Sequence, residues 1–300
     1  MDKELNGIIV VNKPKGFTSF DVIAKLRGIL HIKRLGHAGT LDPMATGVLP
    51  VFVGKATKAC DILPNNEKSY KAGFKLGIKT DTQDITGEIV FEEKSCVKFD
   101  ELSDKVKMFL GETEQLPPMY SAVSIGGKRL YELAREGKEV ERKPRKIFVE
   151  SCDITEFDEK SQTGVLNIHC SKGTYVRTII HDLGEALKTG GVLTSLERTS
   201  SSGYDISQSY TLDEIESLMS SGKGIEGIMY PIDSAFDLYE KVILNPKHTR
   251  LYKNGVKLRL EQIGANGGNT YRVFGCDNEF LGLGFADGKA NEFIIKKNFF

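Results

Sequence analysis

Net charge is the first thing that this sequence lacks. Its 41 lysines and arginines balance 41 aspartates and glutamates. That balance excludes a protein that holds nucleic acid by bulk charge alone, although it leaves room for a basic groove on an otherwise acidic body. With 300 residues, 40% of them hydrophobic, the chain is long enough for one large domain with a sizeable core and a second, smaller domain.

Paired cysteines and long apolar runs are also missing. The five cysteines are odd in number, lie far apart and include no CxxC motif, which argues against a disulfide framework or a zinc knuckle. We therefore expect buried free thiols in a reducing cytosol. No apolar run approaches the roughly 20 residues that cross a bilayer, and the start at Met1–Glu4 lacks the layout of a signal peptide. These features predict a cytoplasmic protein that does not enter a membrane.

The motifs of several enzyme classes are absent as well. The sequence has no GxSxG elbow, no GKS or GKT phosphate loop, no HExxH and no GxGxxG. The five histidines show no metal-ligand spacing with one another; they are His31, His37, His169, His181 and His248. What remains is a mechanism built on one carboxylate, with no cofactor and no bound metal.

The apolar pattern predicts strands and helices in the first 230 residues. The run GIIVVN (7–12) indicates a buried strand, and Thr18 or Ser19 can cap a helix over 20–30. A loop is expected over 31–47 and a turn at 200–203. Further strands are expected at 48–53, 70–76, 147–154 and 165–170, and further helices at 57–63, 100–109, 178–189 and 212–221.

After Pro231 the pattern changes to short strands with frequent glycines between them. Such spacing is typical of a small β-barrel or sandwich, so we predict a domain boundary near residue 238. The strands are expected at 242–244, 258–260, 271–274, 281–285 and 293–295.

The strongest basic cluster lies within residues 117–146. Eight lysines and arginines and four glutamates occupy 128–146. A solvated helix with i,i+4 side-chain pairs explains this composition as well as a nucleic-acid contact does, and both interpretations stay open. The candidate RNA-binding side chains are Lys128, Arg129, Arg142, Lys143, Arg145 and Lys146.

A glycine-rich stretch, GHAGTLDPMATGVLP (36–50), contains the ionisable residues His37 and Asp42. Its glycines allow positive φ angles and close approach to a ligand, and Pro43 holds Asp42 away from the α region. Loops between buried strands commonly carry function. A structural loop, in which Asp42 accepts backbone N–H groups, accounts for the same residues, so local reasoning leaves catalysis open.

Two further segments offer polar side chains at element boundaries. In KGTYVR (172–177), Arg177 could pair with a carboxylate and keep it ionised in a water-poor pocket, or it could be a surface arginine. In KSYK (68–71), Tyr70 could stack on a base, a contact worth about 1–3 kcal/mol, or it could be an ordinary core tyrosine.

The segment GHAGTLDPMATGVLPVFVGKATK (36–58) resembles the signature of the TruB family of tRNA pseudouridine synthases. The resemblance covers residues 7 to about 205, and NPKHTRLYKNG (245–255) is similar to the start of the family's C-terminal PUA-type barrel. Ser124 departs from the family pattern, which commonly has lysine there, and this puts one RNA or structural contact in doubt. The other blocks, in the family's order, are NKPKGFTS (12–19), KSYKAGFKLGIKTDTQDITG (68–87), PPMYSAVSIGGKRLYELAREG (117–137), GTYVRTIIHDLG (173–184) and LERTSSSGY (196–204).

The resemblance implies an α+β fold in two domains. Residues 1–238 would form the catalytic domain, built on a mixed, largely antiparallel sheet flanked by helices, and 239–300 a small PUA-like β-barrel that binds RNA. The implied reaction is the isomerisation of uridine to pseudouridine at position 55 of tRNA. The implied partner is the T-arm stem-loop, which a monomer would bind without a protein partner.

The same resemblance assigns roles to six side chains. Asp42 would be the catalytic aspartate, and Arg177 would form an ion pair with it. The other four would surround the substrate: Tyr70 against the target base, His37 next to the flipped-out nucleotide, and Tyr175 and Leu196 in the pocket wall. Whether the carboxylate first adds to the substrate or removes the C2′ proton stays open.

Three other functions compete with this one. A non-catalytic tRNA-binding or tRNA-folding module would use the basic segment and the barrel, but it would not need Asp42, Tyr70 and Arg177 together. A glycoside hydrolase breaks the same type of bond, but most such enzymes use two carboxylates and only Asp42 stands out. A guide-RNA-dependent enzyme acting on ribosomal RNA is disfavoured, because the stand-alone family's blocks occupy 68–146.

Overall fold

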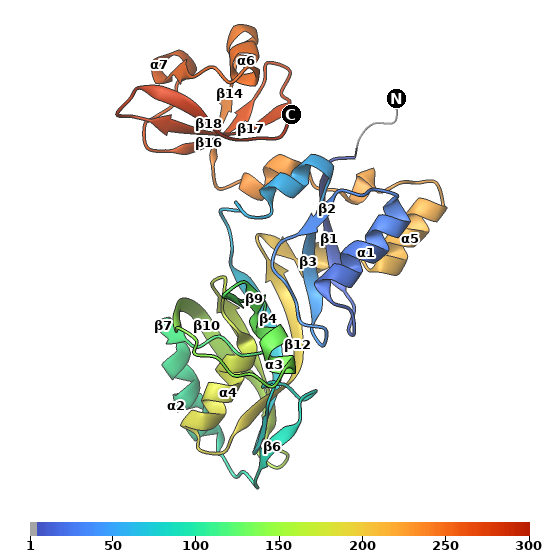
Figure 1. Ribbon diagram of the computed structural model, residues 1–300, viewed down its shortest axis with the longest axis vertical. Coiled ribbons are helices and arrows are strands. Elements are labelled where there is room, and N and C mark those ends of the chain that lie inside the picture. Colours follow the sequence, from blue (N-terminus) through green and yellow to red (C-terminus); the bar gives the residue numbers. More distant parts are fainter. Residues whose placement is uncertain (1–4) are drawn as a thin grey trace.

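The computed structural model describes residues 5–300; Met1–Glu4, on which the expected lack of a signal peptide partly depends, lie outside them. The chain forms three parts along one long axis (Figure 1), with the C-terminal strands at one end, the N-terminal strands in the middle and the segment from β4 to α4 at the other end. No helix among the described residues is long and apolar enough to span a membrane.

The first two parts contain both strands and helices. The strands are β1 (Gly7–Lys13), β2 (Leu35–His37), β3 (Thr46–Val53), β4 (Lys68–Leu76), β5 (Ile78–Thr80), β6 (Ile89–Glu92), β7 (Gly111–Gln115), β8 (Ser124–Ile125), β9 (Lys128–Arg129), β10 (Arg145–Asp158), β11 (Thr163–Cys170), β12 (Gly191–Ser201) and β13 (Tyr204–Asp205). The α-helices are α1 (Ser19–Leu30), α2 (Phe99–Val106), α3 (Leu130–Arg135), α4 (Val176–Ala186) and α5 (Leu212–Ser220). The 3₁₀ turns are η1 (Gly54–Ala59), η2 (Lys107–Phe109), η3 (Ile206–Gln208), η4 (Glu226–Ile228) and η5 (Ile232–Phe236).

The first helix begins where the sequence predicts it. Thr18 is the N-cap of α1, and a capping box joins it to Asp21, whose backbone N–H donates to Thr18 Oγ1 over 3.0 Å. The helix buries Val22, Ile23 and Leu26 in a cluster with residues of β1 and β3. It lies beside α5 on one flank of the molecule (Figure 1).

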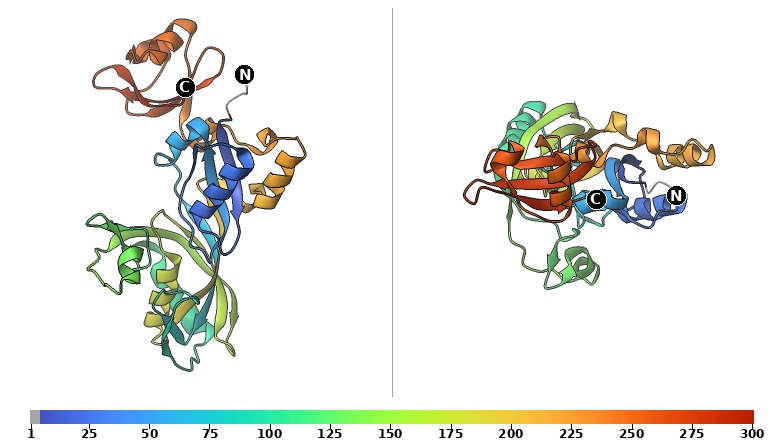
Figure 2. Two further views of the ribbon diagram at one scale, coloured as in Figure 1. Left: turned by 45° about the vertical axis from the view of Figure 1, so that its right-hand side comes forward. Right: turned by 90° about the horizontal axis from the view of Figure 1, so that it is seen from above.

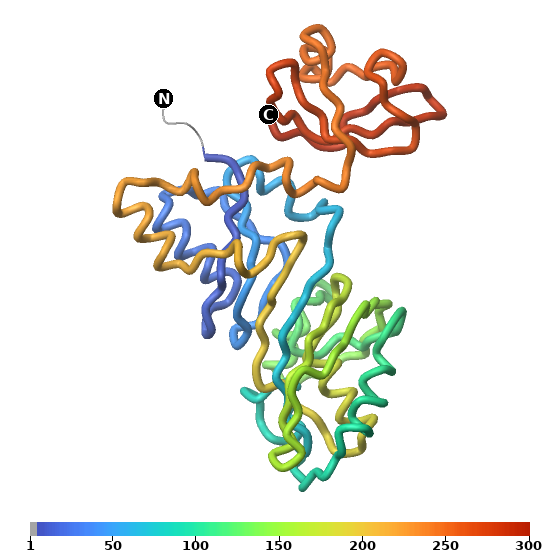
Figure 3. Tube along the Cα trace, turned by 180° about the vertical axis from the view of Figure 1, so that it is seen from behind, coloured from blue at the N-terminus to red at the C-terminus, as the bar shows by residue number. Residues whose placement is uncertain are grey.

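A nine-stranded sheet runs through both parts in the order β1-β3-β12-β4-β11-β10-β7, with β2 added to β3 and β13 to β12. Its pairings are antiparallel except for the short parallel contact between β3 and β12. Seen from behind (Figure 3), β12 and the segment that leads into β4 run from the N-terminal part to the next. The expected mixed, largely antiparallel sheet with flanking helices is confirmed.

Several local predictions were wrong. The loop expected over 31–47 contains the short strand β2, and the helix expected over 57–63 is the 3₁₀ turn η1. The turn expected at 200–203 begins two residues late, because β12 runs as far as Ser201. Few residues of β12 are aliphatic, and pairing with β3 and β4 on its two sides makes it a strand despite its serines and threonines.

The C-terminal part is a five-stranded sheet in the order β14-β16-β17-β18-β15, compatible with a PUA-like domain. Its strands are β14 (Glu240–Ile243), β15 (Leu258–Arg259), β16 (Thr270–Phe274), β17 (Phe280–Asp287) and β18 (Glu292–Asn298). All five strands overlap their predicted positions. The helices α6 (Pro246–Lys253) and α7 (Leu260–Ile263) were not predicted, although Asn245 at the N-cap and Pro246 at N1 are a recognisable start signal for α6.

All five cysteines are free, as the sequence predicts. Cys152 and Cys170 are buried in the main core, and burial raises the pKa of the Cys152 thiol to about 12. The expectation of burial is wrong for Cys96 and Cys276, which are exposed because each lies in a loop between elements.

Candidate active site

Asp42 lies on the loop between β2 and β3, and both of its neighbours are fixed. Leu41 is buried, and its backbone N–H donates to Ser19 Oγ over 2.9 Å. The Pro43 carbonyl accepts from the Gly16 N–H over 2.8 Å and from Lys13 Nζ over 3.5 Å. With both flanking residues anchored to the start of α1 and the turn before it, the Asp42 side chain is held out from the loop and keeps 37% of its surface exposed.

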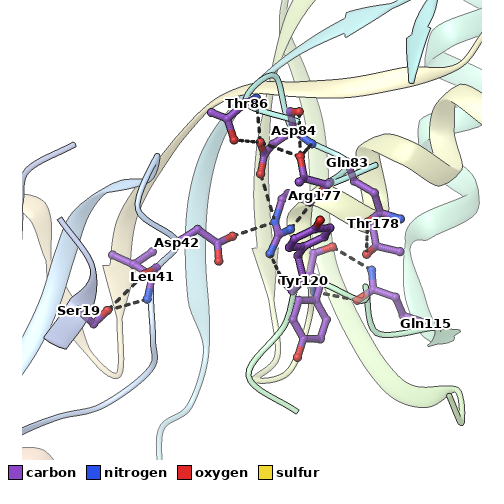
Figure 4. A network of polar contacts seen from close by, with 12 residues as sticks. Ser19, Leu41, Asp42, Gln83, Asp84, Thr86, Gln115, Tyr120, Arg177 and Thr178 are labelled. Atoms are coloured by element: carbon purple, nitrogen blue, oxygen red, sulfur yellow. Dashed lines mark hydrogen bonds and ion pairs between the residues drawn. The ribbon is translucent and has the colours of Figure 1, made fainter. Parts of the chain in front are cut away.

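Arg177, in the first turn of α4, forms an ion pair with Asp42. Arg177 Nε donates to Asp42 Oδ2 over 2.8 Å (Figure 4). The side chain is only 5% exposed, and its other donors reach two backbone carbonyls, Thr82 O over 2.9 Å and Tyr120 O over 2.8 Å. One guanidinium therefore joins the β2–β3 loop to two segments that are distant in the sequence. The fork geometry of arginine makes this possible, and a lysine would offer only a point charge.

A second carboxylate, that of Asp84, also lies near Arg177 Nε. Its Oδ2 is 3.9 Å from Arg177 Nε, and its Oδ1 accepts from the backbone N–H and the hydroxyl of Thr86. Asp84 lies within the block 68–87, but nothing in the sequence indicated a role for it. The nearly buried Asp84 carboxylate therefore lies next to the same Nε atom that donates to Asp42.

An apolar wall faces the Asp42 loop. Tyr70 on β4 and Leu196 on β12 belong to one buried cluster with Leu41 and Met44 from the loop itself. Burial raises the pKa of the Tyr70 phenol to about 12, with the nearby Arg198 charge opposing the shift. Tyr70 therefore presents a neutral ring to the site.

Arg198 on β12 is fully buried below the loop, and sequence reasoning missed it. Its Nε donates to Val48 O over 2.7 Å and its Nη2 to Gly39 O over 3.0 Å. It thus fastens both sides of the loop that carries Asp42. Burial, only partly offset by the Tyr70 hydroxyl beside it, lowers the pKa of the guanidinium. Its only signal in the sequence was its place in the block LERTSSSGY (196–204).

The two other predicted pocket residues are positioned differently from each other. His37 ends β2 and is half-buried, and its Nδ1 is buried without a hydrogen-bond partner among residues 5–300. Burial first, and then the Arg198 charge, lowers the pKa of His37, so its imidazole is neutral at pH 7. Tyr175 precedes α4, and its backbone N–H and C=O are both bonded to the Gln115 side chain at the end of β7.

The basic segment 117–146 stands out from the body of the molecule around α3 (Figure 2). The expected solvated helix is only the six-residue α3, because loops and the short β8–β9 pair occupy the rest. Arg142 is 16% exposed, and its Nη1 donates to Pro117 O over 3.1 Å, which ties the two ends of the segment together. Lys128 pairs with Glu136 and Lys146 with Glu112. Arg129, Lys143 and Arg145 are exposed and form no ion pair with residues 5–300.

In the assembled site, the Asp42 carboxylate is held in one orientation beside an apolar wall. The neutral phenol of Tyr70 and the neutral imidazole of His37 lie nearby. The charged groups of the site come from different elements: Asp42 from a loop, Arg177 from a helix and Asp84 from the segment after β5 (Figure 4). The described residues contain one group with the spacing of a metal site, and it lies outside this arrangement.

Comparison with known proteins gives consistent results along the chain. The family model "TruB family pseudouridylate synthase (N terminal domain)" matches residues 27–176, and "tRNA pseudouridylate synthase B C-terminal domain" matches residues 177–237. A protein named tRNA pseudouridine synthase B from Clostridium novyi is 41% identical over 95% of this chain and 97% of its own length. A protein of the same name from Lactobacillus gasseri is 46% identical over 85% of this chain and 88% of its own length. Among solved structures, a chain from the crystal structure of a Cbf5-Nop10-Gar1 complex superposes with a TM-score of 0.75 at 26% identity, covering 98% of this chain and 85% of that one.

Proposed function

This chain belongs to the TruB family of pseudouridylate synthases, and we propose that it converts uridine to pseudouridine at position 55 in the T loop of tRNA. The observation that carries this proposal is the ion pair between Asp42 and Arg177. It places a directed carboxylate beside an apolar wall, on the segment that matches the family signature.

The proposed reaction is an isomerisation, so no atoms are gained or lost overall. The bond from uracil N1 to ribose C1′ breaks, the uracil turns, and C5 bonds to C1′. The C5 proton leaves and N1 gains one. Asp42 is the catalytic residue, acting on the ribose either as a nucleophile or as the base that takes the C2′ proton. Arg177 orients its carboxylate through the 2.8 Å contact.

The target nucleotide must leave its stack before this chemistry begins. We propose that Tyr70 packs on the extruded uracil, that His37 lies beside the flipped nucleotide, and that Tyr175 and Leu196 complete the pocket. A neutral phenol and a neutral imidazole suit an uncharged base. The high pKa of Tyr70 and the lowered pKa of His37 keep both groups uncharged at neutral pH.

The remaining parts of the chain would bind the rest of the substrate. We propose a catalytic domain over 1–238 and an RNA-binding domain over 239–300, with the segment 117–146 against the T arm. The proposed working unit is a monomer in the cytoplasm that needs neither a protein partner nor a guide RNA. The high identity to proteins named tRNA pseudouridine synthase B, over nearly their whole length, supports a stand-alone enzyme.

The test uses the purified protein and an unmodified tRNA transcript with no other component. Pseudouridine is mapped chemically, and a transcript with cytidine at the target position serves as a control. We expect one modified uridine in the T loop with the wild type and none with Asp42→Asn, which keeps the size of the side chain but removes its charge. Asp61→Asn, at an exposed site, should behave as the wild type.

Binding of the same transcript separates the alternatives. Asp42→Asn should bind tRNA nearly as well as the wild type, because the carboxylate acts on the reacting nucleotide and the phosphate contacts lie elsewhere. Normal pseudouridine yield from Asp42→Asn would refute the assignment. Tight binding without any modification by the wild type would support the non-catalytic module, and modification that appears only after a guide RNA is added would support the guide-dependent alternative.

A further inference from the structure

Three potential metal ligands meet at one place on the large sheet, and none of them belongs to the Asp42 site. His169 lies on β11, Glu150 on β10, and Glu67 immediately before β4. Their ligand atoms all lie within 4.8 Å of one another. The sequence could not indicate this group, because the three residues are far apart in the chain and His169 has no second histidine at ligand spacing.

A break in strand pairing brings Glu150 into the group. In the β10–β11 pair the register shifts between Val149 and Ser151, so Glu150 has no partner in the ladder. Such a bulge redirects a side chain, and bulges are common where a strand serves a specific site. Here it places the Glu150 carboxylate 3.1 Å from His169 Nε2.

The distances within the group suit one small cation. Two ligands on a tetrahedral zinc ion, at bond lengths of about 2.0–2.1 Å, lie about 3.3–3.4 Å apart. His169 Nε2 lies 3.1 Å from Glu150 Oε2 and 3.7 Å from Glu67 Oε2, on either side of that value. Both glutamates are 61% exposed, so small rotations of their side chains can equalise the two distances.

Ser69 orients the His169 imidazole through Nδ1, the ring nitrogen that the two glutamates do not contact. Its Oγ lies 2.7 Å from His169 Nδ1, and the two residues are direct partners in the β4–β11 ladder. Nδ1–H can donate to this hydroxyl, and Nε2 then presents its lone pair towards the two carboxylates, where a cation can bridge the three groups. A hydrogen bond to the second ring nitrogen is the usual support of a metal-bound histidine.

We propose that Glu67, Glu150 and His169 form a binding site for a divalent first-row transition metal, with Zn²⁺ the first to test. Imidazole with carboxylate ligands suits such ions. The three ligands leave a fourth position for water. Both carboxylates are largely exposed, so an ion can reach them from solvent. Bound metal would join β4, β10 and β11 behind Tyr70.

The experiment measures metal binding directly. The full-length protein is treated with a chelator, exchanged into metal-free buffer and titrated with Zn²⁺ against a chromophoric competitor, and Co²⁺ absorption reports the coordination. We expect one ion per chain. His169→Ala should abolish that ion, and Ser69→Ala should weaken its binding by about 10–100-fold because the imidazole loses its orientation. His31→Asn, at an exposed histidine far along the chain, is the matched control.

Two results would overturn the proposal. One is a wild type that binds Zn²⁺ no more tightly than His169→Ala. The other is loss of the ion in His31→Asn together with its retention in His169→Ala, which would place the metal elsewhere. Thermal unfolding of each variant verifies that it is folded. Because the readout is metal binding and not pseudouridine formation, its failure leaves the proposed enzymatic function untouched.

Discussion

The Arg177 guanidinium shares its donors among three segments, and its function depends on that sharing. Lysine at this position keeps the charge but cannot reach Asp42, Thr82 O and Tyr120 O together. We expect Arg177→Lys to lower kcat by about 100-fold, the usual cost of one misplaced electrostatic contact in an active site. Single-turnover pseudouridine formation measures this loss.

The control for that substitution is Arg27→Lys, on the exposed last turn of α1, which should leave the rate unchanged. Thermal unfolding separates a chemical effect from loss of the fold. A rate for Arg177→Lys within twofold of the wild type, in a folded protein, would mean that a positive charge alone is enough and that the fork has no role.

Lys13 gives a pH dependence to stability. It is fully buried, and burial lowers its pKa from 10.5 to about 8, with the Asp42 charge opposing the shift. Between those values the unfolded chain holds the proton that the folded chain has lost, so the free energy of unfolding contributed by Lys13 rises with pH from about 8 to 10.5. We expect the wild type to gain stability relative to Lys13→Met across this window.

Urea unfolding at several pH values from 7 to 10 gives this comparison. Lys15→Met, an exposed lysine in the same turn, is the control and should follow the wild type at each pH. A stability difference between the wild type and Lys13→Met that stays constant with pH would contradict the titration of Lys13 in this range.

At the scale of elements, the contact between β3 and β12 shapes the catalytic loop. Gly47 has φ +100°, and a Cβ atom there would lie 2.3 Å from the Arg198 carbonyl oxygen. We expect Gly47→Ala to lower the free energy of unfolding by at least about 2 kcal/mol, because both the left-handed backbone and the close contact oppose a side chain. Denaturant unfolding measures the change.

Gly28 is the matched control for this substitution. It lies inside α1, and nothing lies within 4 Å of the position that a Cβ atom would take. Gly28→Ala should therefore stabilise the protein by about 0.5–1 kcal/mol. If Gly47→Ala were as well tolerated as Gly28→Ala, the strand contact would not constrain the loop.

At the scale of the whole molecule, the chain has zero net charge, so its affinity for tRNA must depend on where charge is concentrated. Lys143 and Arg145 are exposed on the projecting segment and form no ion pair with residues 5–300, whereas Lys146 is paired with Glu112. Replacing Lys143 and Arg145 by alanine should weaken tRNA binding and reduce the slope of log K against log salt by about 0.7–0.9 per lost phosphate contact.

Lys146→Ala is the internal comparison for that measurement and should reduce the slope less, since its ion pair already engages the side chain. Binding is measured at several salt concentrations, because one value cannot separate charge from other contacts. An unchanged slope for the Lys143 and Arg145 double variant would mean that this segment is only a solvated surface.

The sequence predicted helices and strands correctly where the residues of a short segment are enough to specify its structure. The capping residue Thr18, the buried runs of β1 and β3 and the five C-terminal strands follow from spacing and burial alone. The strand β12 did not, because its serines and threonines become a central strand only between β3 and β4. The segment 117–146 was ambiguous because its composition fits a solvated surface and a nucleic-acid contact equally well.

The sequence by itself determined the family, through ordered blocks around Asp42, Tyr70 and Arg177, and with it the residues that are expected to act. Only the tertiary structure decided how these residues meet. Arg177 reaches Asp42 across 135 positions, and Asp84 and Arg198 gain their places by the same long-range packing. The physical reason is that spacing along a chain specifies helices, caps and strands, whereas ion pairs between distant segments depend on sheet register and loop closure.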